Sequence, residues 1–150
     1  WQIDVYGDGP LRAFYDFRYK QITSNAGSAT YTLHGWLPAE EVPLKMNSAF
    51  ITVTAGMAGV RALASGSLCI GVGAKGNVGV QMGSNLRAGL WSNFGDHGIF
   101  GFDEPSIYKD LLSIDSAAAY EDIVLTAREV ARRTNSQSVV DSKMLAGLHC

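Results

Sequence analysis

Residues 70–82 read IGVGAKGNVGVQM, and this stretch is the clearest structural signal in the chain. Apolar residues alternate with glycine from Ile70 to Ala74, and the alternation resumes from Val78 to Met82. Between the two runs lies Lys75-Gly76-Asn77, which has the chemistry of a turn. The segment therefore predicts a β-hairpin with apolar side chains on one face and mostly glycine on the other.

The glycine face of this hairpin carries its own prediction. Glycine weakens a strand, so it is expected where another group approaches the backbone closely. We expect Gly71, Gly73 and Gly79 to lie beneath a packed element, most plausibly an amphipathic helix over residues 120–131. A ligand or another subunit are the alternatives, and either would make the glycine face a contact surface.

Two further patterns extend the predicted sheet on either side of the hairpin. Residues 11–20 alternate strictly between apolar and polar, and residues 29–37 do so again after a turn at 24–27, which predicts a long hairpin. The β-branched run from Phe50 to Ala55 predicts another strand. Short apolar runs at 86–91 and 99–102 suggest more strands.

The last third of the chain changes to a helical period. Asp103-Glu104-Pro105 is typical of a helix start before residues 107–112, and Asp115 or Ser116 can cap a longer helix through Arg133. A third helix is expected over 139–145, with Gly147 as its stop. The fold class is therefore α+β: an antiparallel sheet of about six to eight hairpin strands in residues 1–102, with two or three helices in residues 105–147 packed on one face.

Composition limits the classes of function. A chain of 150 residues with 47% hydrophobic content is long enough for one compact domain, which we expect to span residues 1–150. Between residues 42 and 95 there is no acidic residue, and Lys45, Arg61, Lys75 and Arg87 give this segment a charge of +4. Four dispersed bases do not make a nucleic-acid footprint, so we expect no nucleic-acid partner.

Cofactor motifs are weak in this chain. Residues 71–76 satisfy the spacing G-x-G-x-x-G, but these glycines fall within a hairpin and no helix N-terminus follows to face a phosphate. His149 and Cys150 are two ligands at a chain end and do not make a metal site. We therefore expect no nucleotide cofactor and no metal.

The two cysteines, Cys69 and Cys150, have competing interpretations. They form a disulfide that ties the C-terminus to the sheet, or they are ordinary thiols with Cys69 buried. A third interpretation is catalytic: Cys69 would be a nucleophile, His97 its base and Asp96 the residue that orients the base. The simpler alternative places Cys69 in the core and Asp96-His97 in a polar turn.

The expected function is non-enzymatic binding, with the enzyme alternative kept open. We expect a secreted protein that contacts a membrane or a cell-surface protein through residues 42–95; a start at Trp1 rather than Met is typical of a processed chain or of an excised domain. Self-association as an assembly subunit through the glycine face is the first alternative, and a small Cys-His hydrolase is the second. The candidate binding residues are Arg61, Gly71, Gly73, Lys75, Gly79, Arg87 and Trp91.

In size, number of cysteines and glycine-rich hydrophobic centre, the chain resembles small secreted microbial toxins and effectors. The resemblance covers no defined motif, so no residue role follows from it.

Overall fold

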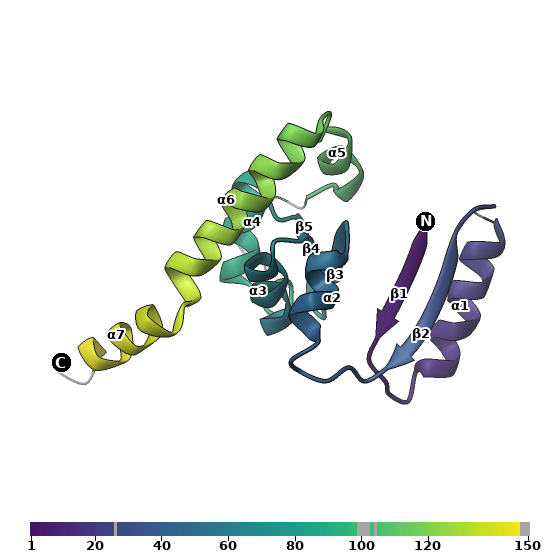
Figure 1. Cartoon of the computed structure of the whole chain (residues 1–150), viewed down its shortest axis with the longest axis horizontal. Coiled ribbons are helices and arrows are strands. Elements are labelled where there is room, and N and C mark those ends of the chain that lie inside the picture. Colours follow the sequence, from purple (N-terminus) through teal and green to yellow (C-terminus); the bar gives the residue numbers. More distant parts are fainter. Residues whose placement is uncertain (26, 99–102, 104, 148–150) are drawn as a thin grey trace. The chain divides into compact units, whose positions relative to one another are not determined.

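The computed structural model describes residues 1–25, 27–98, 103 and 105–147, with side chains as far as Ser142. It divides into two compact units, Trp1–Val42 and Pro43–Cys150 (Figure 1), which are described separately. Across the described residues, five strands lie in two small sheets and are combined with helices. The α+β class is therefore confirmed, whereas the predicted sheet of six to eight hairpin strands is wrong. A single domain over 1–150 stays a prediction.

The first unit is a strand–helix–strand motif. Strand β1 (Gln2–Tyr6) is followed by helix α1 (Arg12–Asn25) and strand β2 (Thr30–Gly35), and the two strands pair in parallel. The long hairpin predicted for residues 11–37 is thus wrong, because its first half is helical. The ion pair Asp16–Lys20 has the four-residue spacing that stabilises a helix, and Asp8, which precedes α1, pairs with Arg12 at its first residue. No residue of α1 is buried.

The second unit contains a three-stranded sheet in the order β3-β4-β5. After helix α2 (Val42–Ser48), strand β3 (Ile51–Thr54), helix α3 (Gly56–Ser65) and strand β4 (Leu68–Gly73) form a parallel unit. Strand β5 (Gly76–Val80) then pairs antiparallel with β4, so the predicted hairpin is confirmed. The predicted strand near Phe50–Ala55 is also confirmed, as β3.

Helices complete this unit. Residues 86–91, expected to form a strand, lie in helix α4 (Gly83–Trp91), and the strand predicted at 99–102 lies outside the described residues. The prediction of C-terminal helices is met in part: α5 (Ile107–Leu112), α6 (Ala117–Asn135) and α7 (Gln137–Gly147) lie in the predicted region, but other helices lie among the strands of residues 1–102. Ser106 caps α5 in place of the predicted acids, and Ser116 caps α6. None of the described helices combines the length and apolar character that a bilayer span requires.

The core lies around β4, whose residues alternate between two hydrophobic clusters. Cys69 packs with Leu63 of α3, Leu86 of α4 and Phe94. Leu68 and Ile70 pack with Val80 and with residues of α5 and α6. The long helix α6 also packs on α3, through Ala127 and Ala131 (Figure 1). The hairpin is therefore held between helices, and this determines the environment of its glycines.

Candidate functional site

The predicted nucleophile, Cys69, lies inside the core. Only 1% of its surface is exposed, and burial raises the pKa of its thiol to about 12. A nucleophilic cysteine needs access and a depressed pKa, and Cys69 has neither. The catalytic interpretation of Cys69, Asp96 and His97 is therefore contradicted by the burial of the thiol.

Asp96 instead joins two backbone segments. Its Oδ1 accepts a hydrogen bond from the Ala74 N–H at 3.4 Å, and its Oδ2 would lie 2.7 Å from a Cβ placed on Gly56, at the start of α3. A carboxylate at a helix N-terminus interacts favourably with the helix dipole. Asp96 thus has a structural role, and His97 is exposed beside it.

The glycines of the hairpin are packed against the protein itself. A Cβ on Gly71 would overlap Val78 and approach Phe94, and one on Gly73 would overlap the backbone of Gly95. A Cβ on Gly79 would lie within 2.8 Å of Asn85, Pro105 and Asp110. Close approach at these glycines is thereby confirmed. The approaching groups belong to residues 93–96, to Asn85 of α4, and to Pro105 and Asp110 at α5, not to α6, so these glycines pack within the protein itself.

The turn that covers Gly73 has an unusual backbone. Asn93, Phe94 and Gly95 all have positive φ angles, of 51°, 55° and 91°. Positive φ is rare for a bulky residue such as Phe and costs roughly 1–2 kcal/mol. Burial of the Phe94 ring and the hydrogen bonds from Gly56 N–H to Asn93 O (3.0 Å) and from Lys75 N–H to Gly95 O (2.8 Å) hold this conformation.

The disulfide between Cys69 and Cys150 stays a prediction. Cys69 has no disulfide partner among the described residues, and Cys150 lies outside them. The part of the chain that the structure describes contains no group of three or more His, Cys, Asp or Glu residues arranged to hold a metal ion.

The other predicted binding residues are at the surface. Lys75 lies in the β4–β5 turn, Arg61 on α3, and Arg87 and Trp91 on α4, and all four are exposed. Each helix places an arginine four residues from a large apolar side chain: Met57 precedes Arg61, and Trp91 follows Arg87. Met57 is 63% exposed and Trp91 is 72% exposed. We call these two pairs the α3 and α4 Arg–apolar pairs. Sequence reasoning missed Met57, because α3 was not predicted.

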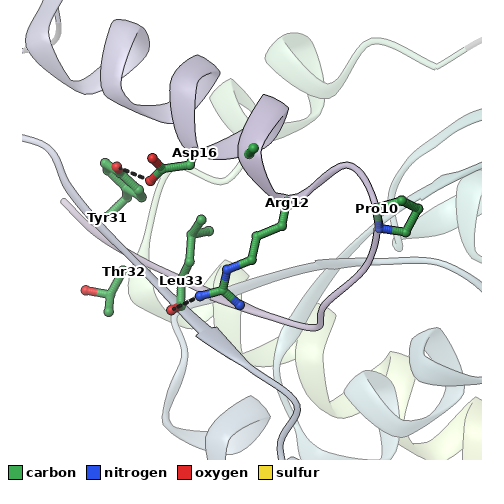
Figure 2. A pocket seen from close by; sticks show the side chains of 7 residues that line it. Pro10, Arg12, Asp16, Tyr31, Thr32 and Leu33 are labelled. Carbon is green, nitrogen blue, oxygen red and sulfur yellow. Dashed lines mark hydrogen bonds between the residues drawn. The ribbon is translucent and has the colours of Figure 1, made fainter.

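The first unit contains a hollow of about 780 Å³ that the sequence did not indicate. Figure 2 shows it between α1 and β2, with Arg12 and Asp16 contributed by the helix and Tyr31, Thr32 and Leu33 by the strand. The Tyr31 hydroxyl donates to Asp16 at 2.7 Å, and Arg12 Nη2 donates to the Leu33 carbonyl at 3.3 Å. These two hydrogen bonds hold α1 in register with β2, with Asp16 beside Tyr31 and Arg12 beside Leu33.

The charged groups of this hollow have partners within the chain: Arg12 pairs with Asp8, and Asp16 pairs with Lys20 and Tyr31. Hydrogen bonds from Lys20 and Tyr31 lower the pKa of Asp16, and the same bond to Asp16 raises the pKa of Tyr31. The carboxylate therefore stays ionised and the phenol protonated at neutral pH.

Comparison with known proteins adds no assignment: the chain matches no protein-family model, no curated protein and no solved structure.

Proposed function

We propose that this chain is a non-enzymatic binding protein whose second unit contacts an anionic membrane surface through the α3 and α4 Arg–apolar pairs. One observation carries the proposal: in a segment of 54 residues without a carboxylate, Met57 and Trp91 are largely exposed, and each lies one helical turn from an exposed arginine. The opposite faces of α3 and α4 are committed to the core, through Ala62 and Leu63 and through Leu86 and Ala88.

The chemistry of these pairs suits a lipid headgroup layer. Tryptophan favours the membrane–water interface, and arginine interacts with lipid phosphates. A basic residue near an anionic surface contributes about 1 kcal/mol, so the four bases of residues 42–95 supply at most ~4 kcal/mol. Binding is therefore expected to be weak, reversible and strongly dependent on salt.

The same proposal includes secretion and a toxin-like or effector-like role. Their support comes from the sequence alone, from its size, its few cysteines and its glycine-rich hydrophobic centre. A cell-surface protein is the alternative partner. The glycines of the hairpin have no part in either version, because they are packed internally.

Flotation with lipid vesicles tests the proposal. The protein should float with vesicles that contain phosphatidylserine and remain at the bottom with pure phosphatidylcholine, and added salt should release it. Absence of flotation with the anionic vesicles at low salt would refute membrane contact.

Matched variants locate the contact. Trp91→Ala and Arg87→Gln should each weaken flotation several-fold, while Trp36→Ala and Arg128→Gln should leave it unchanged. Trp36 is also largely exposed but lies in the first unit, and Arg128 lies on α6. An equal loss in all four variants would mean that binding is non-specific and that α4 is not its site.

A further inference from the structure

The methionines of the second unit differ in how far their sulfur is open to solvent. Met57, the second residue of α3, is 63% exposed and belongs to neither hydrophobic cluster. Met46 packs against the cluster around Cys69, and Met82 packs against the cluster around Ile70. Among the described side chains, the thioether of Met57 is therefore the one that a small reagent reaches without displacing the core.

The sulfur atom of Cys69 does not compete for such a reagent. Its thiol is 1% exposed, and burial raises its pKa to about 12, so almost no thiolate is present at neutral pH. Oxidation of a cysteine follows its thiolate character and its exposure. A thioether carries no ionisable proton, so exposure decides which methionine reacts. An oxidant should therefore act on Met57 first.

The expected reaction is oxidation of the Met57 thioether to a sulfoxide. The sulfur lone pair attacks one oxygen of hydrogen peroxide, an S–O bond forms and the O–O bond breaks. The leaving hydroxide takes the proton of the transferred oxygen and becomes water. Sulfur loses two electrons and the peroxide gains them, so no further reactant is needed.

Oxidation changes the chemistry of the α3 Arg–apolar pair while the core stays packed. Methionine sulfoxide is polar, so it no longer favours the apolar side of a membrane interface. Its new oxygen accepts hydrogen bonds, and Arg61 lies one turn away on the same side of the helix. The buried residues of α3 that hold the helix in place, Ala62 and Leu63, contain no sulfur.

We infer that Met57 is a site of reversible oxidation by peroxides, and that its sulfoxide releases the second unit from the membrane surface. This inference rests on the proposed contact through the α3 and α4 Arg–apolar pairs. Reversibility follows from the chemistry, because methionine sulfoxide reductases return the sulfoxide to the thioether. The exposure of Met57 gives such an enzyme the same access as the oxidant.

Mild oxidation of the folded protein tests the first part of the inference. Hydrogen peroxide is added to the whole chain in buffer, and peptide mapping by mass spectrometry follows the gain of oxygen at Met57, Met46 and Met82. Met57 should react roughly ten-fold faster than the other two, whereas all three should react at similar rates in denaturant. Equal rates in the folded protein, or a faster reaction at Met46 or Met82, would overturn the inference.

Vesicle flotation tests the second part. Protein oxidised at Met57 should float several-fold less with phosphatidylserine vesicles, and treatment with methionine sulfoxide reductases should restore flotation. Met57→Leu keeps an apolar side chain without sulfur, so this variant should float like the unmodified protein both before and after peroxide. The same variant controls for oxidation of Trp91, which is 72% exposed.

The outcomes separate this inference from the proposed function. If the untreated protein does not float with anionic vesicles, the membrane contact itself is refuted and the switch fails with it. If the untreated protein floats and the Met57 sulfoxide floats equally well, the contact stands and the switch is overturned. A loss of flotation in peroxide-treated Met57→Leu that equals the loss in the unmodified protein would overturn it as well.

Discussion

Gly73 lies directly beneath the backbone of Gly95, so close that a side chain on Gly73 would overlap the Gly95 carbonyl group. The same carbonyl accepts a hydrogen bond from Lys75 N–H at 2.8 Å. The hairpin and the left-handed turn at 93–95 therefore dock backbone to backbone. Glycine at position 73 is needed for this contact and not for its own φ angle.

Replacement of this glycine should destabilise the protein. In Gly73→Ala, the new methyl group meets backbone that cannot rotate away, and overpacking of this kind costs about 1–3 kcal/mol. We expect a lower melting temperature in a thermal scan, with vesicle binding of the folded protein unchanged.

Gly9→Ala is the matched control for that variant. A Cβ on Gly9 meets nothing within 4 Å, and no positive φ is found there, so stability should stay constant or rise slightly as the unfolded chain loses entropy. Equal melting temperatures for Gly73→Ala and the unmodified protein would contradict close packing at Gly73.

The fold could be predicted where the pattern of residues records a buried face. The hairpin of β4 and β5 and the amphipathic helix α6 were predicted for this reason. Helix α1 was not, because its apolar residues Phe14, Tyr15 and Phe17 are exposed and their spacing marks no buried face. The parallel pairs β1–β2 and β3–β4 join strands that flank a helix, and no local pattern encodes that pairing.

The same distinction applies to the candidate sites. Repeated glycine correctly indicated close approach at Gly71 and Gly73. The segment that approaches them is the turn at 93–95, which requires a positive φ angle at Phe94, and phenylalanine rarely adopts one. The sequence therefore did not reveal this turn. The four-residue spacing of Asp16 and Lys20 brings their charges together only on a helix. A strand prediction for residues 11–20 therefore concealed this ion pair.

Asp110 should matter for stability because it attaches α5 to the hairpin. Its Oδ2 accepts hydrogen bonds from the Val80 N–H at 3.2 Å and from Asn85 Nδ2 at 2.9 Å. Asp110→Ala leaves two part-buried donors unsatisfied, which costs roughly 1–3 kcal/mol. Urea unfolding should show this loss, whereas Asp122→Ala, at an exposed position of α6, should change stability by less than about 0.5 kcal/mol. Similar values for both variants would contradict the attachment.

Cys69 should resist alkylation in the native protein. Its thiol is 1% exposed, and burial raises its pKa to about 12, so both access and thiolate are lacking at neutral pH. Iodoacetamide followed by peptide mapping should show Cys69 unmodified in buffer and fully modified in denaturant. Rapid native labelling of Cys69 would contradict its burial and restore the nucleophile as a candidate.

The raised pKa of Cys69 also predicts how stability depends on pH. The folded-state pKa of about 12 lies above the ordinary value of 9.0, so both states keep the proton at low pH and the stabilising difference is fully present there. As the pH rises above 9.0, the unfolded chain releases this proton while the folded chain holds it, and the free energy of unfolding falls by up to about 1.4 kcal/mol per pH unit.

A Cys69→Ala variant isolates this effect. Tyrosines and other groups titrate alike in the variant and in the unmodified protein, so the difference in unfolding free energy between the two proteins reports on Cys69 alone. Urea unfolding of both, from about pH 8 to about pH 10.5, should give curves that converge with rising pH. Parallel curves would mean that the thiol ionises equally in both states, which is incompatible with its position between Leu63 and Phe94 in the core.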